Sequence, residues 1–206
     1  MPDLPRPLRF DAVVLAGGRA RRLDGAAKPL LVRRGSTLLG TALDSLGAAE
    51  RRVVAGPPSL LPAVRGAALV QEQPPFGGPV AGLAAAMPLL DRDDPPEWVV
   101  VLAADLVAPA AAVQRLLAEA ASASDDSLLA VDADGRAQQL LGVHRRSTLA
   151  AALARLGTAD GASVRSLLAG SRVRLVEVPI GSTADVDAPA DLREHGIDLP
   201  PARGAE

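Results

Sequence analysis

One stretch of this sequence, AVVLAGGRARRLDGAAKPLL at residues 12–31, constrains the fold more than any other. Its apolar run at residues 12–16 predicts a buried strand, and the adjacent Gly17 and Gly18 predict a tight turn free of side chains. Successive backbone N–H groups in such a turn can bind an anion. The stretch therefore predicts a strand that ends in a candidate phosphate-binding loop.

The charges of the stretch favour the same interpretation. Six basic residues and one acidic residue, Asp24, lie between Arg19 and Arg34, in a chain of net charge -2. Lys28 is the only lysine among 206 residues, and a lysine ammonium is a compact point charge that suits a phosphate. The alternative is a solvated basic loop that only connects two elements.

Composition indicates the class of fold. A chain of 206 residues fits one compact domain, which we expect at residues 11–196 between a tail at 1–10 and a tail at 197–206. Apolar residues make up 49 % of the chain and aromatic residues 1 %, so the core must consist of Leu, Val and Ala. Such a core suits helices on a parallel sheet better than an aromatic-rich β-sandwich.

Several classes of function are excluded by what the chain lacks. Without cysteine it forms no disulfide, no thiolate nucleophile and no cysteine-ligated zinc site. His144 and His195 lie too far apart in sequence for a metal-ligand spacing. Residues 1–10 do not read as a signal peptide, and no apolar run approaches the roughly 18 residues of a membrane span. The near-balanced charge and the small number of aromatic residues argue against a nucleic-acid binding surface. We expect a cytoplasmic protein with small-molecule substrates and no membrane contact.

Strands and helices are predicted to alternate along most of the chain. The apolar patterns and turn signals predict strands at residues 11–16, 30–32, 52–55, 67–70, 98–104, 127–131, 139–144 and 172–178. They predict helices from Ser36 or Thr37 to about Gly47 and at residues 60–64, 80–90, 111–121, 146–156, 163–168 and 189–195. We expect strands 127–131 and 139–144 to form an antiparallel hairpin appended to a parallel core. The fold class is α/β: a single-domain, three-layer αβα sandwich with a mostly parallel, mixed sheet.

Two later segments are further candidates for a ligand site. The loop QEQPPFGGP at residues 71–79 leads into a predicted helix, whose start is flanked by Gly78 and Gly82. Asp105 directly follows the most apolar predicted strand, and α/β sheets bind ligands beyond the carboxyl ends of their strands. Asp105 is therefore a candidate metal ligand. The alternatives are a plain connecting loop at 71–79 and a capping role for Asp105.

The glycine loop matches neither of two common phosphate motifs. G-x-G-x-x-G fails because the next glycine after Gly18 is Gly25, and the Walker pattern fails because Lys28 does not follow Gly25 directly. The sequence fits L-A-G-G-x-x-x-R-x-x-G-x-x-K-x-L instead. Here the chain resembles the nucleotidyltransferases of the nucleotide-diphospho-sugar transferase fold, and within them the molybdenum cofactor guanylyltransferases. The segments GPVAG at 78–82, Asp105 and DVDAPADL at 185–192 extend the resemblance over nearly the whole chain.

The resemblance implies a role for each matching residue. Lys28, Arg22 and Asp105 would be catalytic, Asp105 and Asp187 would bind Mg²⁺, and Arg22, Arg165 and Asp185 would bind the acceptor. The guanine nucleotide would contact Leu15, Ala16, Gly17, Gly18, Gly25, Lys28, Gln73, Gly78, Gly82 and Asp105.

The sequence departs from the family pattern at several positions. Ala27 stands where an acidic residue is frequent, Asp24 where a glycine is usual, and Gln73 where an aspartate is frequent. Asp185 and Asp187 stand where relatives often have asparagines, and an Asp pair is common in cytidylyl-transferring relatives. The base and the acceptor are therefore less firmly indicated than the type of reaction.

The implied reaction transfers GMP from GTP to the terminal phosphate of molybdenum-molybdopterin and releases pyrophosphate. The acceptor, a phosphate monoester, is largely dianionic at pH 7 and needs no general base. Alternatives are a CTP-dependent molybdopterin cytidylyltransferase, a GTP-dependent enzyme for a small phosphorylated acid, and a catalytically silent nucleotide-binding protein. The resemblance also implies transient contact with proteins that deliver or accept molybdopterin, and a monomer or weak oligomer.

Overall fold

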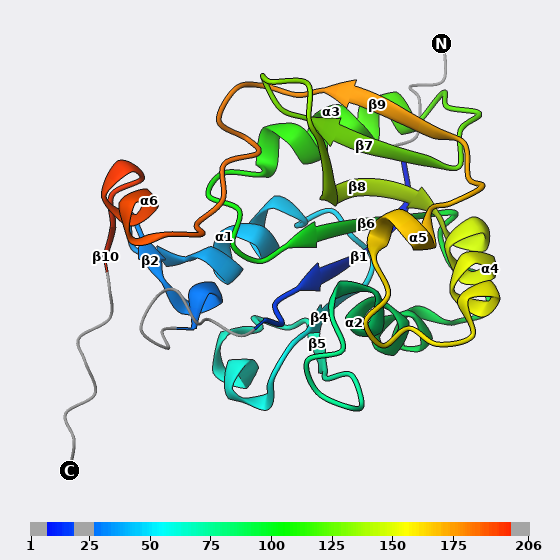
Figure 1. Cartoon of the computed structure of the whole chain (residues 1–206), viewed down its shortest axis with the longest axis horizontal. Coiled ribbons are helices and arrows are strands. Elements are labelled where there is room, and N and C mark those ends of the chain that lie inside the picture. Colours follow the sequence, from blue (N-terminus) through cyan, green and yellow to red (C-terminus); the bar gives the residue numbers. More distant parts are fainter. Residues whose placement is uncertain (1–7, 19–26, 199–206) are drawn as a thin grey trace, which may run out of the picture.

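A seven-stranded sheet forms the centre of the described chain, as the computed structural model shows (Figure 1). The structure describes residues 8–18 and 27–198. The strand order is β5-β4-β1-β6-β8-β7-β9, and β8 alone runs antiparallel to its neighbours in this sheet. The strands are β1 (Phe10–Leu15), β4 (Arg52–Ala55), β5 (Ala68–Val70), β6 (Trp98–Ala103), β7 (Ser127–Val131), β8 (Ala137–Arg145) and β9 (Val173–Glu177). The predicted mostly parallel, mixed sheet is confirmed.

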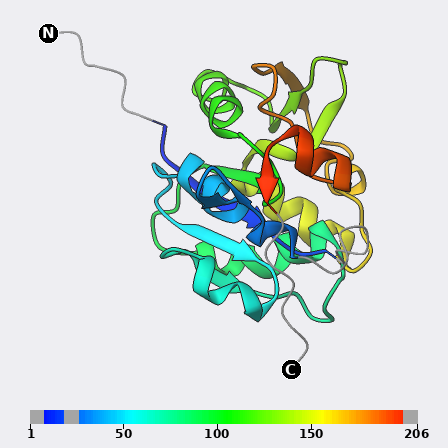
Figure 2. The ribbon, with the colours of Figure 1, turned by 90° about the vertical axis from the view of Figure 1, so that its left-hand side faces the viewer.

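Helices cover both faces of this sheet, as the two views show (Figures 1 and 2). On one face, α1 (Leu38–Ser45) and α3 (Ala110–Ala120) pack against side chains such as Val14. On the other face, α2 (Pro79–Ala86), α4 (Arg146–Leu156) and α5 (Val164–Leu167) pack against side chains such as Val13. Successive residues of a strand point to opposite faces of the sheet, so a continuous apolar strand provides side chains for the helices on both faces. The three-layer αβα architecture is confirmed.

A second, three-stranded sheet lies beside the main one and was not predicted. It has the order β10 (Ile197–Asp198), β2 (Val32–Arg33) and β3 (Ser36–Thr37), and it accompanies the last helix, α6 (Pro189–Glu194). Ile197 is buried against Leu31 and Leu192, so the chain remains ordered beyond residue 196, where we expected the tail to begin. Two-residue strands are too short to show a periodic apolar pattern, which explains why no signal in the sequence predicted them.

The β7–β8 hairpin forms as predicted, but it is not appended to the parallel core. β8 lies between β6 and β7 and pairs with both. Gly142 allows this close packing, because a Cβ there would lie 2.7 Å from Leu129 Cδ2 and 2.9 Å from the Leu128 carbonyl oxygen. Leu141 and Val143 are fully buried, as an interior strand requires.

The bounds of the remaining elements agree with those predicted from the sequence to within a few residues, with one exception. Thr37 caps α1 as predicted, since its hydroxyl accepts a hydrogen bond from the Gly40 N–H at 2.9 Å. The exception is the segment predicted as a strand at 30–32, where the 3₁₀ helix η1 (Lys28–Leu30) precedes the short β2. Two more 3₁₀ helices, η2 (Pro58–Ala63) and η3 (Met87–Leu90), follow β4 and α2. No described helix is long and apolar enough to cross a membrane.

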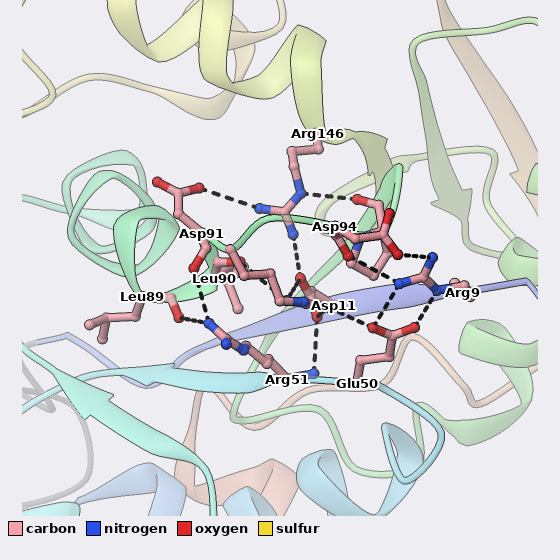
Figure 3. A network of polar contacts seen from close by, with 11 residues as sticks. Arg9, Asp11, Glu50, Arg51, Leu89, Leu90, Asp91, Asp94 and Arg146 are labelled. Atoms are coloured by element: carbon pink, nitrogen blue, oxygen red, sulfur yellow. Dashed lines mark hydrogen bonds and ion pairs between the residues drawn. The ribbon is translucent and has the colours of Figure 1, made fainter.

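A buried ion network fixes the amino-terminal end of β1 (Figure 3). Asp11 is fully buried, and its carboxylate accepts hydrogen bonds from Arg92 at 2.8 and 3.1 Å, from Arg146, and from the Arg51 backbone N–H at 3.0 Å. Glu50 extends the network, since Arg92 donates to it at 2.7 Å. The network thus ties β1 to the start of α4 and to the loop before β6, at the opposite end of β1 from the glycine turn.

Candidate active site

A cavity of about 740 Å³ opens at the carboxyl ends of the parallel strands. Leu15, Ala55 and Ala103, the last residues of β1, β4 and β6, form its floor. This is the edge at which open α/β sheets bind ligands. A smaller cavity of about 160 Å³ adjoins it around Lys28 and shares Leu15, Gly17, Gly18 and Asp105 with it.

The glycine turn lies at both cavities, where the sequence predicted a phosphate loop. Gly17 and Gly18 line both, and Ala16 lines the smaller one. Gly18 has φ +140, a backbone conformation that favours glycine. Among the described residues, apart from its neighbours in the chain, no atom lies within 4 Å of where its Cβ would be.

Lys28, Asp105 and Asp187 meet at this site from three distant parts of the chain. Lys28 Nζ lies 2.6 Å from Asp187 Oδ1 and 3.8 Å from Asp105 Oδ2. The Asp191 carboxylate positions the Asp187 loop by accepting hydrogen bonds from the backbone N–H groups of Asp187 and Ala188, both at 2.7 Å. The two predicted metal ligands are thus held around one ammonium group.

The carboxylates of the site outnumber the cations among the described residues. Burial raises the pKa of Asp105, and the positive charge of Lys28 opposes this shift. Burial, and then the negative charge of Asp187, raises the pKa of Asp185, which also lines the larger cavity. Both shifts indicate that the site would be more stable with additional positive charge.

Asp105 and Asp187 could together hold a metal ion, because both lie beside the Lys28 ammonium. Within residues 8–18 and 27–198, no three His, Cys, Asp or Glu side chains are grouped closely enough to hold an ion. Magnesium commonly takes one or two carboxylates and completes its shell with water and substrate phosphates. Asp105 and Asp187 offer such a pair.

The second glycine segment forms another wall of the larger cavity. Gly78, with φ +91, directly precedes α2, and Gly78, Pro79 and Gly82 all line the cavity. A Cβ on Gly82 would lie 3.3 Å from Ala55 Cβ and 3.4 Å from Leu15 Cδ2, so this glycine lets α2 pack closely on the strand ends. The exposed N–H groups at the start of a helix favour an anion there.

Glu72, and not the predicted Gln73, lines the cavity. Gln73 is exposed and is not part of the wall, whereas Glu72 is 7 % exposed and faces the cavity. Glu72 Oε1 accepts a hydrogen bond from the Phe76 N–H at 2.9 Å. The residue expected from the family pattern is thus one position away from the residue that lines the wall. One signal in the sequence could have indicated Glu72, because it is an acidic residue only two positions after the short apolar strand β5. Acidic side chains are rarely buried, so one that is buried at the end of a strand commonly has a functional or structural partner.

Other predicted contacts have mixed outcomes. Asp185 lines the cavity, but Arg165 is exposed and does not, because α5 buries Val164 and Leu167 and turns Arg165 outward. Arg22 and Gly25 lie outside the described residues, and their roles stay predictions. The sequence also missed the wall built by the amino-terminal half of β8, which includes Gln138 and Gln139.

A profile of the MobA-like NTP transferase domain matches residues 12–177, from β1 to the end of β9. The chain belongs to this family. The match includes the glycine turn, Lys28, Glu72, the Gly78 segment and Asp105, and it ends before Asp185 and Asp187.

Individual relatives agree with this assignment. The chain is 31 % identical over 135 residues to the molybdenum cofactor guanylyltransferase of Shewanella baltica, a match that covers 64 % of this chain and 66 % of that relative. The match thus spans slightly less than two thirds of the relative's length.

Solved structures support the fold. Molybdopterin-guanine dinucleotide biosynthesis protein A from Archaeoglobus fulgidus superposes with a TM-score of 0.67 at 21 % identity, over 90 % of this chain and 96 % of that one. The 2-C-methyl-D-erythritol 4-phosphate cytidylyltransferase from Thermus thermophilus superposes with a TM-score of 0.65 at 19 % identity, over 91 % and 97 %. At these identities the likeness extends to the fold and does not distinguish a guanine from a cytosine nucleotide.

Proposed function

We propose that this protein is a magnesium-dependent guanylyltransferase. It would transfer GMP from GTP to the terminal phosphate of molybdenum-molybdopterin and release pyrophosphate. The observation that carries the proposal is the ion-pair cluster of Lys28, Asp187 and Asp105 beside a glycine turn, at the edge of a MobA-like domain.

Charge explains why this cluster suits a triphosphate. Among described residues that line the two cavities, Glu72, Asp105, Asp185 and Asp187 are acidic, and Lys28 is the basic one. Because Lys28 is the one positive charge among these described residues, further positive charge would favour the binding of a triphosphate and a dianionic acceptor. A magnesium ion held by Asp105 and Asp187 would neutralise this charge and polarise the reacting phosphate.

The chain's own groups would bind and orient the nucleotide. Lys28 would exchange its carboxylate partner for a phosphate oxygen, and the N–H groups of the Gly17–Gly18 turn and the start of α2 would donate hydrogen bonds to further phosphate oxygens. The Glu72 carboxylate would accept hydrogen bonds from the N1–H and the 2-amino group of guanine. Two donors side by side on one base edge suit a carboxylate with two oxygens.

The transfer itself is a displacement at phosphorus. An oxygen of the acceptor phosphate attacks the α-phosphorus of GTP, the bond from that phosphorus to the bridging oxygen breaks, and pyrophosphate leaves with the electron pair. Because the acceptor oxygen is already deprotonated near pH 7, no general base is needed. No histidine is among the described residues that line either cavity, which is consistent with this mechanism. Positioning and charge stabilisation would supply the catalysis.

The test is a comparison of nucleotides with and without magnesium. Thermal unfolding with GTP, CTP, ATP and UTP should show selective stabilisation by GTP that requires Mg²⁺. Pyrophosphate release from GTP should then depend on added molybdopterin. Selective stabilisation by CTP would replace the proposal with the cytidylyltransferase alternative. No response to any nucleotide would favour the silent protein, and response to GTP without turnover of molybdopterin would favour another small phosphorylated acceptor.

A further inference from the structure

Phe76 is an aromatic side chain placed at the wall of the larger cavity. The chain has three aromatic residues, and Phe10 and Trp98 lie in the core at 3 % and 2 % exposure. Phe76, in contrast, is 56 % exposed and lines the cavity together with Glu72 and Gly78. One of the three aromatic side chains of the protein thus lies at its candidate nucleotide site, and the other two lie in the core.

The backbone of Phe76 adopts a conformation that a phenylalanine rarely takes. Its φ is +70, in the left-handed region, where the side chain crowds the backbone. Among described residues, Arg34 and Arg65 are the other non-glycine residues with positive φ, and neither lines a cavity. Such strain at a cavity is typical of sites that hold a ligand.

The loop around Phe76 is held from two sides. The Phe76 N–H donates to Glu72 Oε1 at 2.9 Å, and the Gly161 N–H donates to the Gly77 carbonyl oxygen at 2.8 Å. Glu72 Oε1 would also lie 3.9 Å from a Cβ on Gly17, so the same carboxylate faces the glycine turn. The backbone of Phe76 is therefore held next to the carboxylate to which the proposed function assigns the edge of the base, and its side chain lines the same cavity.

We infer that the Phe76 ring stacks on the face of the nucleotide base, while Glu72 binds its edge, and that the ring favours a purine over a pyrimidine. Stacking of a base on an aromatic side chain increases with the overlapping area, and a purine offers more area than a pyrimidine. The inference rests on the proposed function, because it concerns the nucleotide of that reaction.

Calorimetric titration with ligands that carry a nucleobase and with one that lacks it tests this inference. Magnesium-bound GTP, CTP and inorganic tripolyphosphate are titrated into the wild type, Phe76→Ala, Phe76→Leu and the control Leu175→Ala. Leu175 is similarly exposed, at 54 %, and lies outside both cavities. Phe76→Ala should raise the Kd of GTP about tenfold and that of CTP by less. The Kd of tripolyphosphate should stay within about twofold, because it has no base. Phe76→Leu should lose most of the same affinity, and Leu175→Ala none.

Several results would overturn the inference. These are an unchanged Kd of GTP in Phe76→Ala, an equal loss of affinity for tripolyphosphate, and wild-type affinity for GTP in Phe76→Leu. A wild type that binds GTP while Phe76→Ala binds it equally well would overturn the stacking role alone. A wild type that binds no nucleotide would overturn the proposed function as well.

A fluorescence measurement provides an independent readout. In Phe76→Trp, GTP with magnesium should quench the emission of the new indole, and tripolyphosphate with magnesium should not. The wild type, whose Trp98 is buried, serves as the background. Absence of quenching at saturating GTP would contradict stacking on the base.

Discussion

Lys28 Nζ lies 2.6 Å from Asp187 Oδ1, although 159 positions separate the two residues in the chain. Asp105 Oδ2 lies 3.8 Å from the same nitrogen. In this arrangement the ammonium neutralises the carboxylates to which we assign the metal. Nucleotide and magnesium binding would therefore be coupled, since Lys28 gains a phosphate partner as the carboxylates gain the metal.

Lys28→Met should lower kcat by about 10²- to 10³-fold, because it removes the positive charge that, in the proposed function, would face the reacting phosphates. The fold should persist, since Lys28 pairs with carboxylates of the site and belongs to none of the apolar core clusters. Pyrophosphate release at saturating GTP measures the loss, and thermal unfolding measures the fold. Turnover at the wild-type rate would remove Lys28 from the reaction.

The same Lys28→Met variant should bind Mn²⁺ more tightly than the wild type when no nucleotide is present. Without the ammonium, no positive charge from Lys28 competes with the ion for Asp105 and Asp187, and we expect a gain of about tenfold in affinity. Titration calorimetry or the electron paramagnetic resonance signal of free Mn²⁺ measures it. An unchanged Mn²⁺ affinity would show that Lys28 does not compete with the metal.

Asp105→Asn should raise the magnesium concentration at half-maximal activity about tenfold or more, because an amide is a weaker ligand for a hard cation. Asp93→Asn is the control, since Asp93 is exposed and lies outside both cavities. The magnesium dependence of pyrophosphate release measures both. If Asp105→Asn and Asp93→Asn give the same magnesium titration as the wild type, Asp105 is not a metal ligand.

The sequence could predict that the glycine turn, Lys28 and Asp105 lie at the site, because each differs in residue type from its neighbours in the sequence. Two adjacent glycines, a single lysine and a carboxylate directly after an apolar strand remain visible without a structure. The sheet order places Leu15, Ala55 and Ala103 side by side, which brings these segments together. The α/β class and the layers followed from the same apolar patterns.

The failures of sequence reasoning have a common physical cause, which is tertiary contact. Glu72 and Gln73 are adjacent, and only the packing of their loop decides which one is buried. β8 enters the sheet because Gly142 leaves room for β7, and Ile197 pairs with β2 from the far end of the chain. Arg165 turns outward because its neighbours Val164 and Leu167 are buried. The pairing of β8 and of Ile197 depends on residues distant in the sequence.

Glu72→Gln should reduce the preference for GTP over ITP, which lacks the 2-amino group. The wild-type carboxylate can accept two hydrogen bonds from guanine, whereas the amide offers one acceptor and one donor. A hydrogen bond to a charged group contributes about 1.5–3 kcal/mol, so the ratio of kcat/KM values should narrow by about 10-fold or more. Glutamine keeps an oxygen for the Phe76 N–H, which preserves the loop. An unchanged GTP-to-ITP ratio would exclude Glu72 from base recognition.

Asp11→Ala should lower the free energy of unfolding by about 3–5 kcal/mol. The substitution removes the carboxylate that pairs with Arg92 and Arg146, and it leaves the positive charges of these partly buried side chains without that partner. Asp94→Ala is the matched control, since that carboxylate is 82 % exposed in its pair with Arg9 and should contribute less than about 1 kcal/mol. Urea unfolding measures both variants. A loss for Asp11→Ala as small as that for Asp94→Ala would show that the network does not stabilise β1.

His144 should make the stability of the protein depend on pH in the mildly acidic range. Its imidazole is 3 % exposed, Nδ1 lies 2.9 Å from Ser127 Oγ, and burial lowers the pKa of His144 from 6.5 to about 4. The unfolded chain therefore takes up a proton as the pH falls below about 6.5, while the native protein does not until the pH nears its lowered pKa.

The free energy of unfolding should accordingly fall by about 2–3 kcal/mol between pH 7 and pH 4.5. The carboxylates with lowered pKa values, such as Glu50 and Asp132, lose most of their contribution at lower pH, and the raised pKa values of Asp105 and Asp185 act with the opposite sign to His144. The comparison of the wild type with a histidine variant therefore isolates His144. Urea unfolding across the window measures the slope, and His144→Gln, which retains a polar partner for Ser127, should flatten it. An equal slope in the wild type and His144→Gln would mean that His144 is not the group that titrates.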